Sequence, residues 1–196
     1  MKRPLPLLAF AVVAASALAA AWAAQDPAAF VQLEPRAMTR VAFFGQTGLA
    51  GEYSIQYGKP AWKTAYDAGF EKMTLGKRIR LGKDWWTTLE SFSALTFGGK
   101  TELAEGEYFL CLECSDKGAW SLIALDPAPL RKSHTDAFAT AKTTGGTAIP
   151  LTYETVAEEE PELKIQFLQP EGKPREQTLE IRFGKHRLTS LVVAKL

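Results

Sequence analysis

Apolar and polar residues alternate along much of the chain with the period of two that is typical of β-strands. The clearest case is Glu52–Tyr57, in which every second residue is a large apolar or aromatic one. Thr178–Phe183 alternates in the same way. Such runs predict strands at Thr39–Phe44, Glu52–Tyr57, Ser93–Phe97, Glu107–Ser115, Trp120–Leu125, Ile149–Val156, Leu163–Leu168, Thr178–Phe183 and Leu188–Ala194.

The centre of this pattern lies in Leu81–Asp126. We expect Ser93–Phe97, Glu107–Ser115 and Trp120–Leu125 to form a β-meander of three consecutive antiparallel strands, because glycines lie in the two connections. Glu107–Ser115 is apolar on both faces near its middle, which is typical of a strand covered on both sides. The first two-thirds of the chain also contain an irregular stretch, Ala61–Asp84, which we interpret as an extended crossing segment with one helical turn at most.

One helix is predicted. Asp126 is a suitable N-cap and Pro127 suits the first helical position. Leu130, Ala137, Phe138 and Ala141 would then share one stripe, and Gly145-Gly146 would end the element. We therefore expect a mainly β fold, an antiparallel β-sandwich of about eight or nine strands with one covering α-helix. Polar turns are expected at Glu158–Pro161 and Gly184-Lys185.

The 196 residues, 46% of them hydrophobic, suffice for one domain with a substantial core. Lys2 and Arg3 precede an uncharged, alanine-rich run, and Ala21–Ala23 resembles a cleavage site, so a signal peptide cut after Ala23 is predicted. An uncleaved anchor is the alternative. The expected organisation is a signal peptide at 1–23, a leader and first short strand at 24–48, and a single β-sandwich domain at 49–196, with export to the periplasm or the cell exterior.

The charge balance argues against a polyanionic partner. Lys and Arg number 23 and Asp and Glu 22 in the whole chain, and the signal peptide would remove two of the basic residues. The sequence has no basic stripe with interleaved aromatics, so we expect no nucleic-acid partner. We also expect no membrane span once the signal peptide is removed.

Cys111 and Cys114 are the only two cysteines, and export would place them in an oxidising compartment. In an extended strand, residues three apart point to opposite faces and lie about 10 Å apart. A disulfide requires Cα atoms closer than about 7 Å. The prediction is therefore two free, partly buried thiols, unless the strand bulges or breaks between them.

Catalytic and metal-binding motifs are missing from the sequence. It contains no His-x-His, His-Glu-x-x-His or Gly-x-Ser-x-Gly motif and no phosphate-binding glycine loop. A metal centre built from His134 and His186 has no support in their spacing, and His186 lies in a predicted turn. We therefore expect no catalytic residue, no metal and no cofactor.

Aromatic and charged residues gather beside Gly/Pro turns, and this cluster is the candidate site. Trp85 and Trp86 would point to opposite faces of a strand, so one of them would face outward or into a cleft. An outward indole offers an apolar face and one N–H donor. The predicted ligand-binding residues are Lys59, Trp62, Lys83, Asp84 and Trp86.

The leading hypothesis is thus a non-catalytic binding module at the cell envelope, with an unknown small-molecule, glycan or protein ligand. A hydrolase that uses carboxylates such as Asp84 and Glu90 is an alternative, and glycoside hydrolysis would need the two acids about 5 to 9.5 Å apart. A purely structural envelope protein is the third possibility. It would be favoured by burial of both Trp85 and Trp86 and by the lack of a pocket.

Five stretches of the chain, taken together, resemble the exported bacterial domain-of-unknown-function family 2911. They are YSIQYGKPAWK (53–63), LGKDWWTTLESFSALTF (81–97), LAEGEYFLCLE (103–113), AWSLIALD (119–126) and LEIRFGKHRLTSLVV (179–193). The resemblance extends roughly from Tyr53 to the C-terminus and implies an exported, β-rich domain without an assigned reaction. The family's Arg-Thr-Gly-Ala-Asn motif is replaced by Trp86-Thr87-Thr88-Leu89-Glu90, and the Arg of its Pro turn by Lys59.

Overall fold

Ten strands, all paired antiparallel, carry the alternating pattern of the sequence. The structure is a computed structural model that describes residues 35–196, which form one compact unit. The predicted signal peptide and most of the predicted leader lie outside the described residues. The strands are β1 (Ala37–Gly45), β2 (Gly48–Tyr57), β3 (Lys77–Arg80), β4 (Thr87–Ser91), β5 (Ala94–Phe97), β6 (Thr101–Leu103), β7 (Gly106–Cys114), β8 (Trp120–Leu125), β9 (Thr147–Leu168) and β10 (Glu176–Lys195).

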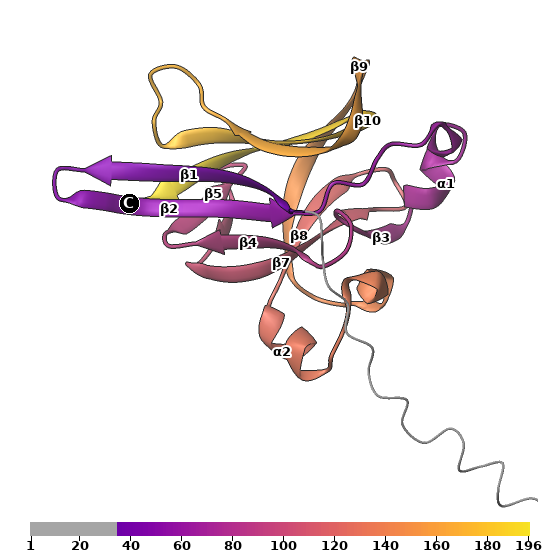
Figure 1. Cartoon of the computed structure of the whole chain (residues 1–196), viewed down its shortest axis with the longest axis horizontal. Helices are drawn as coiled ribbons and strands as arrows, with labels where there is room; N and C mark the ends of the chain where they lie inside the picture. Colours follow the sequence, from indigo (N-terminus) through magenta and orange to yellow (C-terminus); the bar gives the residue numbers. More distant parts are fainter. Residues whose placement is uncertain (1–34) are drawn as a thin grey trace, which may run out of the picture. The chain divides into compact units, whose positions relative to one another are not determined.

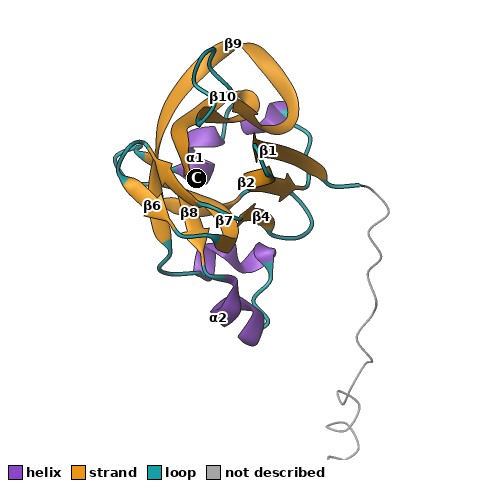
Figure 2. Cartoon of the chain, turned by 90° about the vertical axis from the view of Figure 1, so that its left-hand side faces the viewer, coloured by secondary structure: helices purple, strands orange, loops and turns teal. Residues whose placement is uncertain are grey.

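The strands follow each other in the order β1-β2-β4-β7-β8-β9-β10-β5-β6, and β3 pairs with β7 beyond the end of β4. The sheet folds over, so that the β1–β2 hairpin lies across from β9 and β10 (Figures 1 and 2). Apolar side chains from both layers fill the space between them, and Tyr53, Leu179 and Val192 are completely buried there. The predicted mainly β, antiparallel sandwich is confirmed.

The prediction that Ser93–Phe97 is the first strand of the meander is wrong. β7 and β8 pair as expected, but β5 pairs with β10 and β6 instead of β7. β4, which the sequence pattern did not reveal, occupies the edge of β7 that we had assigned to β5. The chain changes layer between β4 and β5, where the Ser91 hydroxyl donates to the Ser93 carbonyl oxygen (2.6 Å).

In the last third of the chain, the structure has two long strands, β9 and β10, where the sequence predicts four short ones. The polar stretch Glu158–Pro161 and the pair Gly184-Lys185, predicted as turns, lie inside these strands. The register shifts there, since Arg182 pairs with Lys164 but His186 pairs with Thr155. β9 thus carries extra residues opposite a short piece of β10, and such bulges bend a strand without ending it.

The predicted covering helix is also two elements. Helix α2 (Pro127–Lys132) is followed by the 3₁₀ helix η3 (Ala137–Lys142). Asp126 caps α2 as predicted, accepting a hydrogen bond from the Ala128 amide (2.8 Å). Asp136 caps η3 in the same way, because its side chain accepts a hydrogen bond from the Phe138 amide (2.7 Å). The second cap marks the start of a separate element.

These two helices cover the outer face of β7 and β8, below the sheet in Figure 1. The predicted apolar stripe is wrong for Phe138, whose side chain is 75% exposed. The residues buried in this outer cluster are Trp86, Phe109, Cys111, Ile123, Leu125 and Ala137.

Both cysteines are free and buried, as predicted. Cys111 belongs to the outer cluster and Cys114 to the inner core, so the two thiols lie on opposite faces of β7. Burial raises the pKa of Cys111 to about 12. It raises the pKa of Cys114 as well.

Side-chain and backbone contacts join the free edge of β9 to the chain that leaves β2. The Tyr57 hydroxyl accepts a hydrogen bond from the Ile165 amide (3.0 Å) and donates one to the Ile165 carbonyl oxygen (3.2 Å). Next to it, the Trp62 amide donates to the Pro161 carbonyl oxygen (2.7 Å) and the Leu163 amide to that of Pro60 (3.0 Å). We call these contacts the seam.

Two 3₁₀ or α-helical turns and β3 lie in the predicted crossing segment. They are η2 (Thr64–Tyr66) and α1 (Phe70–Thr74), at the right in Figure 1. Within residues 35–196, no helix is long and apolar enough to cross a membrane.

Replacing Tyr57 with Phe should lower the free energy of unfolding by about 1–3 kcal/mol, because the change leaves two buried backbone groups of Ile165 without their partner. Urea denaturation measures this loss. Tyr108→Phe is the matched control, since the Tyr108 hydroxyl makes a single exposed hydrogen bond, to the Ala104 carbonyl oxygen (3.1 Å). Equal losses in the two variants would show that the Tyr57 contacts do not hold the seam.

Candidate functional site

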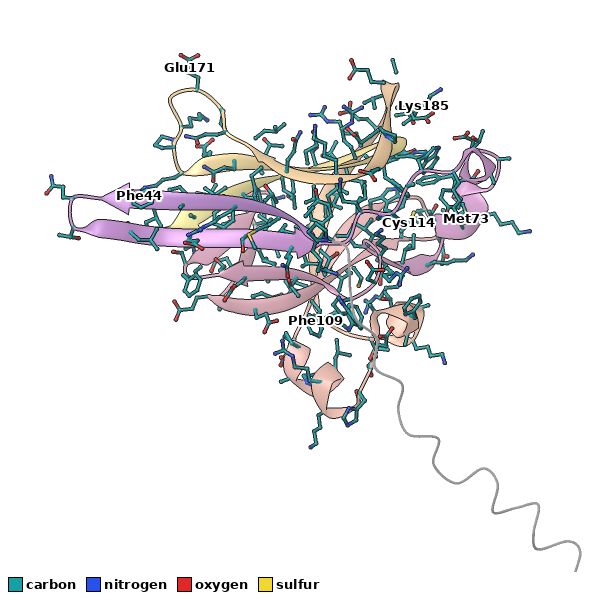
Figure 3. All side chains as sticks on the ribbon, viewed as in Figure 1. Phe44, Met73, Phe109, Cys114, Glu171 and Lys185 are labelled. Atoms are coloured by element: carbon teal, nitrogen blue, oxygen red, sulfur yellow. The ribbon has the colours of Figure 1, made fainter. Side chains whose placement is uncertain are left out.

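A cavity of about 380 Å³ lies between the crossing segment and the bent part of β9 and β10. In Figure 3, Met73 and Lys185 mark this end of the molecule, and Phe44 marks the opposite end. The wall of the cavity is largely apolar. It is formed by residues of the crossing segment, β3, β7, β8, β9 and β10. The ring-bearing lining residues are Trp62, Tyr66, Phe70, Trp120, Phe183 and His186.

Trp62 rests on the backbone of β10 at the bend. A Cβ atom added to Gly184 would lie 2.5 Å from two carbons of the indole, and Gly184 has a φ of +60°. Phe183 and Tyr66 meet the indole nearly at right angles, at 87° and 79° between the ring planes. The bend, the missing side chain of Gly184 and the Trp62 ring therefore form one packed unit at the cavity wall.

His186 stands next to this unit on β10. Its ring stacks on Phe70 with 3.5 Å between centroids and 6° between planes. Its Nδ1 lies 2.9 Å from the Tyr153 hydroxyl. Burial lowers the pKa of His186, and the nearby charge of Asp67 opposes this only in part.

Within residues 35–196, no acidic or lysine side chain lines the cavity. Arg80 is the one lining residue with a full charge, but its guanidinium group lies over the Phe138 ring, 4.1 Å from the ring centroid. Alternation along β3 explains this placement, because Ile79 packs on the inner core while Arg80 points to the outer face. The space inside is consequently uncharged when His186 is neutral.

The five predicted ligand-binding residues do not form one site. Trp62 lines the cavity, and the exposed Lys59 lies just before it, in an ion pair with Glu162 (2.7 Å). Lys83 and Asp84 belong to the turn before β4, where the Lys83 amide donates to the Gly58 carbonyl oxygen (3.3 Å).

Trp86 lies on the far side of the sheet. It is 8% exposed, stacks on Phe109 at 5.2 Å and donates its indole N–H to the Thr135 carbonyl oxygen (3.2 Å). The two tryptophans differ in exposure, and Trp85 is the exposed one (41%), but both precede β4, so the expected alternation within a strand does not apply. Trp86 is thus a core residue beneath the helices.

The predicted ligand-binding residues include Trp62 but not His186, Tyr66 or Phe70. His186 was assigned to a turn because Gly184-Lys185 looked like a chain reversal. The signal for the crossing segment was its spacing, since Trp62, Tyr66 and Phe70 are each four residues apart. Such spacing is typical of one face of a helical turn.

Comparisons with models of protein families, with curated proteins and with solved structures find no match for this chain. The resemblance to the family of exported bacterial domains is therefore still a prediction. Among residues 35–196, no group of three or more His, Cys, Asp or Glu side chains is placed to hold a metal ion.

Gly184→Ala should destabilise the fold by about 2–4 kcal/mol, because an L-residue is strained at this φ and its Cβ would press into the indole. Gly172→Ala is the control. Gly172 has a φ of +73° but open space around the added Cβ, so about 1–2 kcal/mol is expected there. Chemical denaturation of both variants gives the difference, and a loss in Gly184→Ala no larger than that in Gly172→Ala would contradict the packing described.

His186 should titrate below its usual pKa of 6.5. As the pH falls, His186 of the unfolded chain binds a proton before His186 of the folded chain does. The contribution of neutral His186 to the free energy of unfolding is therefore full above about pH 6.5 and is lost below it. NMR titration of the ring measures the pKa directly. The variant His186→Phe should show a flatter fall of the unfolding free energy below pH 6.5, and an unchanged slope would contradict the burial of the ring.

Proposed function

We propose that this protein is a non-catalytic binding protein that holds a small, mainly apolar molecule in the cavity beside Trp62 and His186. The observation that carries the proposal is the cavity itself: its wall is rich in aromatic rings and contains no carboxylate. Its volume of about 380 Å³ falls in the range of about 300–1,000 Å³ that small-molecule sites occupy.

The lining supports a small molecule better than a glycan or a protein segment. Each sugar hydroxyl that enters an apolar space costs free energy unless it finds a hydrogen-bond partner. The wall offers few such partners, because most of its residues are aromatic or aliphatic. An apolar molecule needs none, and it gains free energy from every part of its surface that leaves water.

The two alternatives receive less support. Asp84 and Glu90, the acids proposed for a hydrolase, are not among the residues that line the cavity. A purely structural role was favoured by burial of both Trp85 and Trp86 and by the lack of a pocket, and neither condition is met. Export to the cell envelope stays part of the proposal, supported by Lys2, Arg3 and the apolar run that follows them.

Binding of N-phenyl-1-naphthylamine, an uncharged probe whose fluorescence rises in apolar surroundings, tests the proposal. The wild-type protein should bind it in a saturable way. Leu112→Trp should lower the affinity at least about tenfold, because Leu112 lines the cavity and the larger side chain would fill it. Fluorescence titration at constant protein concentration gives the dissociation constants.

Leu168→Trp is the matched control, since Leu168 is 38% exposed near the end of β9 and is not part of the cavity wall. It should bind the probe like the wild type. Lys83→Ala and Asp84→Ala should also leave the affinity within about twofold, because these residues lie outside the wall. Saturable binding that Leu112→Trp does not weaken, or no binding at all, would contradict the proposed function.

A further inference from the structure

His186, a residue of the cavity wall, has one ring nitrogen without a hydrogen-bond partner among the described residues. His186 uses Nδ1 in its contact with the Tyr153 hydroxyl. The other ring nitrogen, Nε2, makes no hydrogen bond within residues 35–196. Nε2 is not enclosed by other atoms of the described residues. It therefore borders open space, and the ring that carries it lines the cavity.

The contact with Tyr153 is compatible with either direction of donation, and the direction determines which ring nitrogen carries the proton. When the phenol donates to Nδ1, the neutral imidazole has its only hydrogen on Nε2. The Thr155 hydroxyl lies 3.4 Å from that of Tyr153 and can donate to it, which favours this direction. In this tautomer His186 presents an N–H donor at Nε2.

A second donor lies in the same wall. The indole N–H of Trp62 is buried and has no partner among residues 35–196, and the rings of Trp62 and His186 are 5.4 Å apart. An unpaired buried donor is costly, but this N–H is enclosed, so Nε2 of His186 is the nitrogen of the two that borders open space.

We propose that the ligand is a flat, uncharged molecule with one hydrogen-bond acceptor, such as a carbonyl oxygen, which the Nε2–H of His186 binds. This inference rests on the proposed function. The acceptor is assigned because the group that borders open space on His186 is a donor, the Nε2–H. The ligand is uncharged because Arg80, the charged lining residue among the described residues, holds its guanidinium group over the Phe138 ring. No lysine or acidic side chain of residues 35–196 lines the space, so a buried charge would lose its hydration without compensation.

Flatness follows from the rings around His186. Phe70 is nearly parallel to it at 6°, and Tyr153 lies at 19°. Trp120 is inclined by only 26° to both Phe70 and Tyr153. A planar ligand can extend this set of parallel faces, whereas a bulky ligand would meet only part of it.

Burial keeps His186 neutral near pH 7, against the effect of Asp67. The groups that face the ring are Asp67, which precedes α1, and Tyr153 on β9. Asp67 raises the pKa of His186, but burial lowers it by more. A neutral acceptor should therefore bind with constant affinity from about pH 7 to 8, where the imidazole keeps its Nε2 proton.

Three probes that share a naphthalene ring system test the inference. Prodan is uncharged and has a carbonyl oxygen, N-phenyl-1-naphthylamine is uncharged and lacks one, and 8-anilinonaphthalene-1-sulfonate adds a negative charge. The wild type should bind the sulfonate at least about tenfold more weakly than N-phenyl-1-naphthylamine, because the charge would be buried unpaired.

His186→Phe keeps a ring in place and removes the donor. The ratio of the prodan to the N-phenyl-1-naphthylamine dissociation constant should rise roughly five- to tenfold, as expected for one lost hydrogen bond. His186→Gln, whose amide can donate from a similar position, should keep the ratio within about twofold of the wild-type value. In the wild type, prodan but not N-phenyl-1-naphthylamine should shift the Nε2 resonance of His186, a measurement that needs no variant.

The outcomes are separable. An unchanged ratio in His186→Phe, or an Nε2 resonance that prodan leaves in place, overturns the assignment of His186 as donor. Sulfonate binding as tight as that of N-phenyl-1-naphthylamine overturns the uncharged ligand. If none of the three probes binds, the proposed function fails and the further inference fails with it.

Discussion

The Trp62 ring lies directly on the backbone of Gly184, and the cavity exists because no side chain stands between them. Gly184 is inside β10, where the register with β9 shifts and the hairpin bends from one layer to the other. A strand that ran straight through this point would carry its side chains into the space that Trp62 occupies. The bend therefore determines where the crossing segment can lie, and it determines the wall of the cavity as well.

The seam holds the other side of the same segment. Its hydrogen bonds attach the chain after β2 to the free edge of β9, where Ala61 and Glu162 form an isolated antiparallel bridge. One buried hydroxyl, that of Tyr57, satisfies both backbone groups of Ile165. Because the seam and the bend act on neighbouring residues of the segment, we expect mutations in either one to change the cavity.

Period-two alternation predicted most strands and the fold class, because each layer buries one face and exposes the other. The prediction failed where the same local composition is compatible with two structures, a turn or a bulge. Gly184-Lys185 and Glu158–Pro161 have the composition of turns, yet in the sheet they form a bulge, and only the partner strand decides between the two. Likewise β4 and β5 are close in sequence but lie in different layers, a separation that pattern alone does not encode.

For the candidate site, the sequence identified Trp62 but grouped it with residues that the fold separates. Chain neighbours were grouped into one surface cluster, although Trp86 faces the helices and Trp62 faces the cavity. His186 became relevant only when the bend brought it beside Phe70 and Tyr153. Sites of this kind are assembled from distant parts of a β fold, so their members share no local motif.

The central claim is that the space beside Trp62, Phe70 and His186 takes up a flat apolar molecule. Crystals soaked with bromobenzene test it most directly, since the bromine can be located by its anomalous scattering. A bromine peak is expected inside the cavity, within contact distance of these rings. Bromine found only on the outer surface, for example near the exposed Phe44 at the tip of the β1–β2 hairpin, or a cavity closed to the soaked molecule, would contradict it.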